Sequence, residues 1–210
     1  MDREFWLEKW ASNKIGFHEP TPHRLLKQWW PTMELSIDHR ILVPLCGKSL
    51  DMTWLNEHHS SITGIEISEI AAISFFEENN FNFRKDQFRK YSVLYANGIE
   101  IYCGDIFEIP PTVFNPFDCV YDRAALVALS PSDRKNYESF ISKVTKPEAK
   151  MLLVTVDYDV ELITPPPHII SKDTLEKTYS DRWDLTELST KTADIKGITG
   201  TETCYRLEKK

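Results

Sequence analysis

The sequence has no uncharged apolar run of about 18 residues, the length that a transmembrane helix requires. Its N-terminal residues, MDREFW, lack the basic start and the apolar stretch of a signal peptide. Blocks rich in lysine or arginine are also missing, and the formal net charge is −7, which argues against a sequence-independent grip on nucleic acid phosphates. We therefore expect a cytoplasmic protein, a single domain over 1–210, that acts on a small molecule and has no nucleic-acid or membrane partner.

Cysteine pairs are lacking as well. The sequence has no C-x-x-C motif, and its four cysteines lie far apart, each in or beside an apolar run: Cys46, Cys103, Cys119 and Cys204. This placement predicts buried free thiols rather than disulfides or a zinc site. His18, Glu19 and His23 are too sparsely spaced for a metal site, so we expect no metal.

Both common nucleotide-binding loops are absent. Gly47-Lys48-Ser49 follows an apolar run, as the end of a phosphate-binding P-loop would. A P-loop needs a glycine where Leu42 stands, and Pro44 removes one of the amide donors that cradle phosphate. The chain also has no G-x-G-x-x-G, which a dinucleotide's pyrophosphate requires and a ligand without phosphates does not.

Apolar runs alternate with helical patterns along most of the chain. This alternation indicates strand–helix–strand units and a mostly parallel sheet with helices on both faces. In the helix after Ser68, we expect Ile70, Ile73 and Phe76 to face the core. The other helices are expected at 48–58, from Ser130 to Val144 and at about 171–180. The expected strands are 40–46, 61–67, 99–103, 117–121, 150–156, 182–188 and 201–207.

The first 39 residues have a different character. A helical stretch rich in tryptophan is followed by a turn through Pro20 and Pro22 and by a second helix from His23 to Trp30. Parallel sheets bind ligands at the carboxyl ends of their strands. We therefore expect 1–39 to form a helical cover over that edge of a core made by 40–210.

Polar side chains follow several of the expected strands. Glu66 ends the second strand, nineteen positions after Gly47, where nucleoside-binding sheets place an acid that accepts both ribose hydroxyls. Asp105 and Ile106, after the third strand, could bind an adenine amino group and ring, although a simple turn explains them equally well. Arg123, after the fourth, would face the ligand or form an internal ion pair. Glu66 could also be a solvated glutamate at a strand end.

Motifs along nearly the whole chain occur in one consistent order. They are FWLEKW (5–10), GFH (16–18), PLCGKS (44–49), GIEISE (64–69), DRAALVA (122–128) and DR (133–134). Together they resemble the thiopurine S-methyltransferases. Each motif is a weak signal alone, and their shared order makes the resemblance specific. The GKS tripeptide then looks like part of an S-adenosylmethionine pocket rather than a phosphate loop.

The resemblance implies a class I methyltransferase: an α/β, Rossmann-like, doubly wound and mostly parallel seven-stranded sheet with an N-terminal helical lid. Its cofactor would be S-adenosylmethionine, with S-adenosylhomocysteine as product. The residues expected to bind the cofactor are Trp6, Trp10, Phe17, Leu45, Gly47, Glu66, Asp105, Ile106 and Arg123. A sulfonium cation favours aromatic faces, which agrees with the tryptophans, although Trp6 and Trp10 could instead form a hydrophobic staple of the N-terminal helix.

The resemblance also implies methyl transfer to the sulfur of thiopurines and related aromatic thiols. Such thiols are substantially ionised near neutral pH, so a strong general base is unnecessary. Arg123 and His18 are the expected catalytic residues: either would stabilise the anionic sulfur, and His18 could take a proton through a water. Phe17, His18 and Arg123 are expected to contact the acceptor. His18 could also be a polar loop residue without a role.

Other activities remain open from the sequence. The loop from Glu19 to His23 departs from the family pattern, so the acceptor could be a selenium or tellurium compound, a halide or a small thiol. A non-catalytic S-adenosylmethionine-binding protein is another alternative, as is a phosphotransferase that uses Lys48 and Ser49. The simplest expectation for assembly is a monomer.

Overall fold

The computed structural model describes residues 3–16 and 18–210. The strands in these residues are β1 (Arg40–Pro44), β2 (Ser61–Glu66), β3 (Arg84–Phe88), β4 (Tyr91–Ala96), β5 (Ile99–Cys103), β6 (Phe117–Arg123), β7 (Thr145–Asp157), β8 (Trp183–Ile195) and β9 (Ile198–Lys209). They form one sheet in the order β3-β4-β5-β2-β1-β6-β7-β9-β8. The neighbours β5, β2, β1, β6 and β7 run parallel, and the strands at both edges are antiparallel.

Strand order creates a switch point beside β1. The chain first extends the sheet from β1 through β2 and β5, and only later adds β6 and β7 on the other side of β1. Loops therefore leave β1 and β6 in opposite directions at their carboxyl ends. Open parallel sheets bind ligands in the crevice that this reversal leaves.

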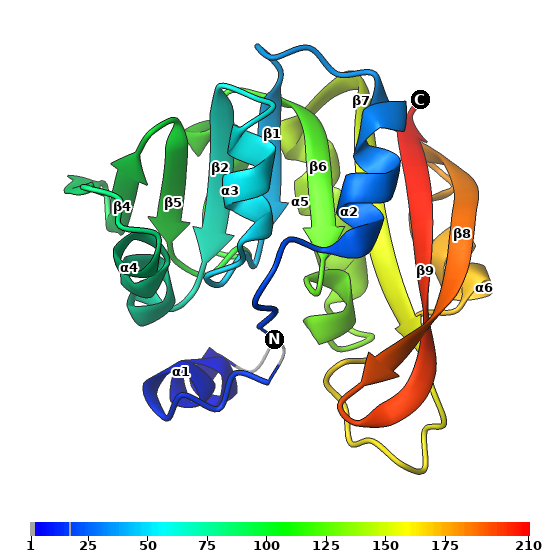
Figure 1. Cartoon of the computed structure of the whole chain (residues 1–210). Helices are drawn as coiled ribbons and strands as arrows, with labels where there is room; N and C mark the ends of the chain where they lie inside the picture. The colour runs from blue at the N-terminus through cyan, green and yellow to red at the C-terminus, as the bar shows by residue number, and fades with distance from the viewer. Residues whose placement is uncertain (1–2, 17) are drawn as a thin grey trace.

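Helices cover both faces of the sheet (Figure 1). Among them, α2, α3 and α4 pack on one face, and α5 and α6 pack on the other. The helices are α1 (Arg3–Ala11), α2 (Arg24–Trp29), α3 (Asp51–Asn56), α4 (Glu69–Glu78), α5 (Arg134–Val144) and α6 (Lys172–Tyr179), with 3-10 turns at Trp30–Met33, Pro111–Val113 and Leu126–Ala128. None of the helices in the described residues has the length and apolar character needed to span a bilayer.

The central strands send alternate side chains into different cores. On β1, Ile41 and Val43 pack with α2, α3 and α4, whereas Leu42 packs with α5 and α6. All three residues are buried. A strand covered on both faces must be apolar at every position, which is the pattern that the continuous apolar run at 40–46 predicted.

Seven strands were expected, and this number is wrong, because the described chain adds the hairpin β3–β4 beside β5. Every residue of β3 is exposed, so this edge strand lacks the apolar alternation from which a strand is predicted. The added pairs are antiparallel, so parallel pairing is confined to the middle of the sheet.

Three helices differ in detail from the expectation, and the first of them, α3, spans Asp51–Asn56 rather than 48–58. Helix α5 begins at Arg134 rather than at Ser130, after a turn. In α4, Ile70 is exposed, while Ala72, Phe75 and Phe76 are buried. Ile70 and Ala72 are two positions apart, which at 3.6 residues per turn places them on opposite sides of the helix.

The first helix lies apart from the sheet. Figure 1 shows α1 beyond the ends toward which β2 and β6 point. Its Trp10 is buried, although the rest of the helix is exposed or half-buried. The following α2 instead packs into the core through Leu25 and Leu26. The N-terminal residues therefore combine a helix over the ligand edge with one anchored on the sheet.

A buried carboxylate fixes the turn after β6. Asp122 is fully buried, and its Oδ1 accepts a hydrogen bond from the Leu126 backbone N–H at 3.1 Å. Its Oδ2 accepts one from the Tyr137 hydroxyl of α5 at 2.6 Å. Burial raises the pKa of Asp122 to about 6, although these hydrogen bonds oppose the shift. The turn that Asp122 holds contains Arg123 and Ala124, whose φ of 69° is unusual for a residue with a side chain.

Tyr137→Phe should destabilise the protein by about 1–3 kcal/mol at pH 8, because it leaves a buried carboxylate oxygen without its donor. The loss should be smaller at pH 5, where Asp122 in the folded state is protonated and needs the donor less. Urea unfolding at both pH values measures this. Tyr95→Phe, which removes a hydroxyl bonded to Asp86 on the exposed hairpin, is the control and should change little. An equal loss at both pH values would contradict the role of the carboxylate.

Candidate active site

A cavity of about 760 Å³ lies at the carboxyl ends of the parallel strands. It sits at the switch point, between the turn after β1 and the ends of β2, β6 and β7. The helix α1, the segment that follows it and the β8–β9 hairpin close the other sides. The wall therefore includes residues 5, 6, 9, 10, 13–16, 18 and 19, residues 45–49, 66, 67, 123, 124, 127, 128, 154 and 156, and residues 164–167, 194–196 and 202.

The turn after β1 is compact and left-handed in part. Leu45 has a φ of 47° and Gly47 a φ of 53°. A side chain in this region costs about 1–2 kcal/mol, so Leu45 is held there by its surroundings. A Cβ added to Gly47 would lie 2.9 Å from the Cζ2 of Trp10. The absence of a side chain at Gly47 thus lets α1 pack directly on this turn.

Glu66 is a buried carboxylate bound by backbone amides. It is 4% exposed, and its two oxygens accept hydrogen bonds from the N–H groups of Gly47 and Ser68, each at 2.8 Å. Burial raises the pKa of Glu66 to about 7, because it outweighs the opposing effect of the backbone donors. Ser68 also caps α4, since its hydroxyl accepts from the Ala71 N–H at 3.3 Å. The β1 turn and the α4 start together fix this side chain in the cavity wall.

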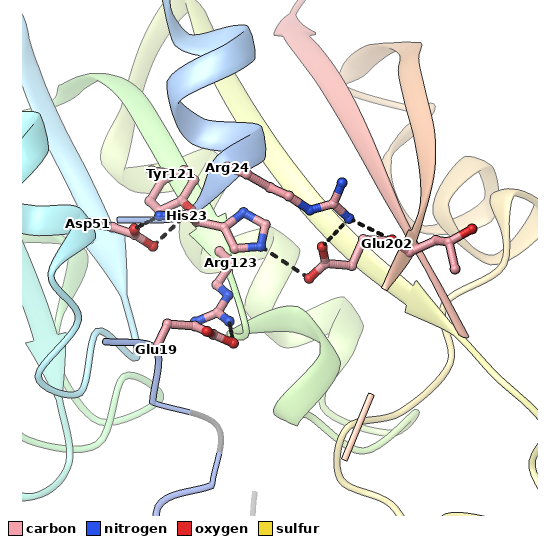
Figure 2. A network of polar contacts seen from close by, with 8 residues as sticks. Glu19, His23, Arg24, Asp51, Tyr121, Arg123 and Glu202 are labelled. Atoms are coloured by element: carbon pink, nitrogen blue, oxygen red, sulfur yellow. Dashed lines mark hydrogen bonds and ion pairs between the residues drawn. The ribbon is translucent and has the colours of Figure 1, made fainter. Parts of the chain in front are cut away.

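Arg123 and His18 both line the cavity. Arg123 extends from the end of β6, and its Nη2 donates to Glu19 Oε1 at 3.2 Å (Figure 2). His18 belongs to the segment between α1 and α2. Burial lowers the pKa of His18, and the charges of Lys48 and Arg123 add to this effect. Near pH 7, His18 is therefore a neutral imidazole that can accept a proton, whereas Arg123 carries the positive charge.

A polar network extends from the cavity wall into the sheet, as Figure 2 shows. Glu202 of β9 lies in the wall and is 3.1 Å from His23 Nε2. The backbone N–H of His23 donates to Asp51 Oδ1 at 2.7 Å, and the Tyr121 hydroxyl donates to Asp51 Oδ2 at 3.0 Å. This buried network ties the start of α2 to α3, β6 and β9.

Sequence analysis missed Glu202. Its neighbours along the chain alternate like those of many strands, and no motif marks it. The pairing of β9 with β7, which sets Glu202 opposite Val156, brings it to the cavity. A signal of this kind depends on long-range strand register, which one sequence does not reveal.

The expected site residues divide into three groups. Those in the cavity wall are Trp6, Trp10, His18, Leu45, Gly47, Glu66 and Arg123. Asp105 and Ile106 are not in the wall that the described residues form: Asp105 Oδ1 accepts from the Phe107 N–H at 2.9 Å, and Ile106 is buried in the core. Both follow β5, whose last residue pairs with Glu66. Phe17 lies outside the described residues.

The sequence matches the family model described as thiopurine S-methyltransferase over residues 1–208. The chain belongs to the thiopurine S-methyltransferase family. A relative with that name from Bordetella petrii is 37% identical, with 100% of this chain and 99% of the relative covered. Another, from Nitrosospira multiformis, is 38% identical over 88% of this chain and 84% of its own length.

Solved structures agree with this thiopurine S-methyltransferase family assignment at the level of fold. A methyltransferase from Anabaena variabilis, named as dependent on S-adenosylmethionine, has a TM-score of 0.69 at 11% identity and covers 99% of this chain and 95% of its own. One from Methanosarcina mazei has a TM-score of 0.67 at 16% identity, over 89% and 97% of the two chains. The expected family and class I methyltransferase fold are therefore confirmed, and this family member is an S-adenosylmethionine-dependent methyltransferase.

Gly47→Ala should weaken binding of S-adenosylhomocysteine at least tenfold, because the new methyl group would push Trp10 of α1 off the turn. Gly197→Ala is the matched control: Gly197 also has a positive φ, of 83°, but nothing lies within 4 Å of its added Cβ. Both variants should lose similar stability in urea unfolding. Calorimetric titration separates them, and equal affinities would show that the Trp10 contact is unimportant for binding.

Proposed function

We propose that this chain transfers the methyl group of S-adenosylmethionine to the sulfur of thiopurines and related aromatic thiols. The observation that carries the proposal is that one cavity is lined by two suitable groups. They are the Glu66 carboxylate at the end of β2 and the Arg123 guanidinium at the end of β6. A carboxylate suits a ribose diol, and a guanidinium suits an anionic sulfur. The names of the relatives supply the acceptor class.

The cavity suits the cofactor in size and chemistry. Its volume of about 760 Å³ falls within the range of small-molecule sites. In our proposal, Glu66 accepts hydrogen bonds from both ribose hydroxyls, since a carboxylate oxygen already bonded to one N–H keeps a second lone pair. Leu45 and Gly47 contribute backbone contacts, and the faces of Trp6 and Trp10 stabilise the sulfonium by about 0.5–2 kcal/mol. When bound, S-adenosylmethionine supplies an electrophilic methyl group.

The roles of three further cofactor residues also stay proposals. Asp105 and Ile106 would bind the adenine edge, which requires the turn after β5 to open toward the cavity, because Asp105 Oδ1 is engaged with the Phe107 N–H. Phe17 would contact both cofactor and acceptor.

On the acceptor side, Arg123 would hold the thiolate in line with the methyl group. Orientation of two bound reactants is worth about 7–11 kcal/mol, so positioning can supply most of the catalysis. His18, being neutral, would accept the proton of a thiol that arrives un-ionised, directly or through a water. Both side chains belong to segments that also line the cofactor end, so cofactor and acceptor share one enclosure.

We further infer a cytoplasmic monomer that works as one domain, with 1–39 covering a core of 40–210. All four cysteines are free thiols, three of them buried, as suits a reducing compartment. The acceptor is a small molecule, and the net charge of −7 disfavours a nucleic-acid partner.

Purified protein should transfer labelled methyl from S-adenosylmethionine to 6-mercaptopurine, and Glu66→Ala should reduce the rate at least a hundredfold through lost cofactor binding. Glu69→Gln is the matched control, because Glu69 is a nearby glutamate, the first residue of α4, that pairs with Lys85 at the surface. Its rate should equal that of the wild type. Wild-type protein that binds S-adenosylhomocysteine but labels no thiopurine would contradict the acceptor.

Cofactor affinity should depend on the ionisation of Glu66. Because its pKa is about 7, the carboxyl is largely protonated below pH 7 and accepts ribose hydroxyls less well. We expect the affinity for S-adenosylhomocysteine to be highest at pH 8.5. Below pH 7 the affinity should decrease, by up to about tenfold for each pH unit, and binding should release a proton. The raised pKa also implies that the Glu66 contribution to stability declines as pH rises from 4.5 to about 7.

Calorimetry from pH 5.5 to 8.5 in buffers of different ionisation enthalpy tests this dependence. Glu66→Gln should bind weakly at every pH and show a flat profile. A flat profile in the wild type, with full affinity at pH 5.5, would show that the ribose does not depend on this carboxylate.

A further inference from the structure

Arg123 lies near two carboxylates that are held in different ways. Glu202 is the fixed one: its side chain is 11% exposed, with Oε1 3.1 Å from His23 Nε2 and Oε2 3.1 Å from Arg24 Nη2. Burial alone would raise the pKa of Glu202, but the His23 hydrogen bond and the charges of His23, Arg123 and Arg24 lower it. Glu202 is therefore an anion held in place by His23 and Arg24, and it interacts electrostatically with Arg123.

Glu19 is held far less firmly. Its side chain is 53% exposed, and Arg123 reaches it through a single Nη2–Oε1 contact of 3.2 Å. Single-point, half-exposed ion pairs contribute little stability, whereas bidentate pairs are the strong ones. Figure 2 shows Glu19 approaching Arg123 from the N-terminal segment, on the side away from α2. Because that segment also lines the cavity, Glu19 holds the guanidinium where an acceptor would need it.

Neighbouring basic groups are less suited to receive an anion. Lys48 Nζ is 2.6 Å from Glu78 Oε1, a shorter ion-pair contact than the 3.2 Å between Arg123 and Glu19. The pKa of His18 is lowered by burial, which leaves it neutral at pH 7. Arg123, whose contact with the half-exposed Glu19 is the longer of the two ion pairs, is the better partner for a thiolate.

We propose that Glu19 is an exchangeable counter-ion of Arg123, which the acceptor thiolate displaces and which returns after methylation. The inference rests on the proposed function, since it takes an aromatic thiolate as the acceptor. Exchange of one anion for another preserves the charge around Arg123. A neutral thiol that removed Glu19 would leave the guanidinium short of one anion, so the exchange selects for ionised acceptors.

The charge of the acceptor changes during transfer. A sulfur electron pair of the thiolate forms the new S–CH₃ bond, and the sulfonium C–S bond breaks with its electron pair left on S-adenosylhomocysteine. The product is a neutral thioether, which no longer competes for Arg123. Glu19 can then return to the guanidinium, so the same contact that disfavours neutral acceptors favours release of the product.

Binding to protein saturated with S-adenosylhomocysteine tests the exchange without turnover. At pH 8.5, Glu19→Gln should bind 6-mercaptopurine about three- to tenfold more tightly than the wild type, because no carboxylate must be displaced. Its affinity for the S-methylated product should be unchanged. Glu8→Gln is the matched control: Glu8 is an exposed acid on α1, and its loss removes the same charge from the N-terminal segment. This variant should behave as the wild type with both ligands.

Equal affinities for 6-mercaptopurine in the wild type and Glu19→Gln would overturn the exchange, as would equal tightening for the methylated product. A methyl-transfer assay run in parallel separates the two claims. Wild-type protein that binds 6-mercaptopurine but does not methylate it would refute the proposed function and leave the counter-ion test readable. Failure of both proteins to bind 6-mercaptopurine would refute both.

Discussion

The site depends on one buried carboxylate held by backbone amides. Glu66 accepts from the N–H groups of Gly47 and Ser68, which belong to the turn after β1 and the start of α4. Each of those segments is shaped for this contact: Gly47 adopts a left-handed conformation, and Ser68 caps the helix that follows. A charge buried without such donors would cost several kcal/mol. The buried carboxylate therefore depends on the conformation of both the turn and the helix start.

The cavity wall carries charged groups of opposite sign at the ends of two strands. Glu66 presents negative charge at the β2 end, and Arg123 presents positive charge at the β6 end. The wall also contains aromatic and apolar residues, among them Trp10, which packs on the β1 turn. In the proposed function, these two charged groups would orient the cofactor and the acceptor within one cavity.

Local sequence patterns were sufficient to predict the cavity residues that lie at or just after the ends of strands. Glu66 and Arg123 end parallel strands, and Leu45 and Gly47 lie in the turn directly after one. Parallel strands end at one edge, so the meeting of these residues in one cavity follows from chain order. The hairpin β3–β4 escaped prediction because β3 is exposed throughout and carries no apolar period. Asp105, although correctly placed after β5, turns its Oδ1 to its own backbone instead of the cavity. Side-chain direction after a strand depends on the local turn, which residue type alone does not set.

By itself, the sequence determined the family, the strand–helix order and the buried strands, because these follow from short-range periodicity and ordered motifs. Tertiary structure decided which polar residues share the site with them. Glu202 reaches the cavity through the β7–β9 register, and Glu19 through the path of the segment between α1 and α2. Contacts between residues far apart in the chain depend on packing and register, for which a single sequence carries no local signal.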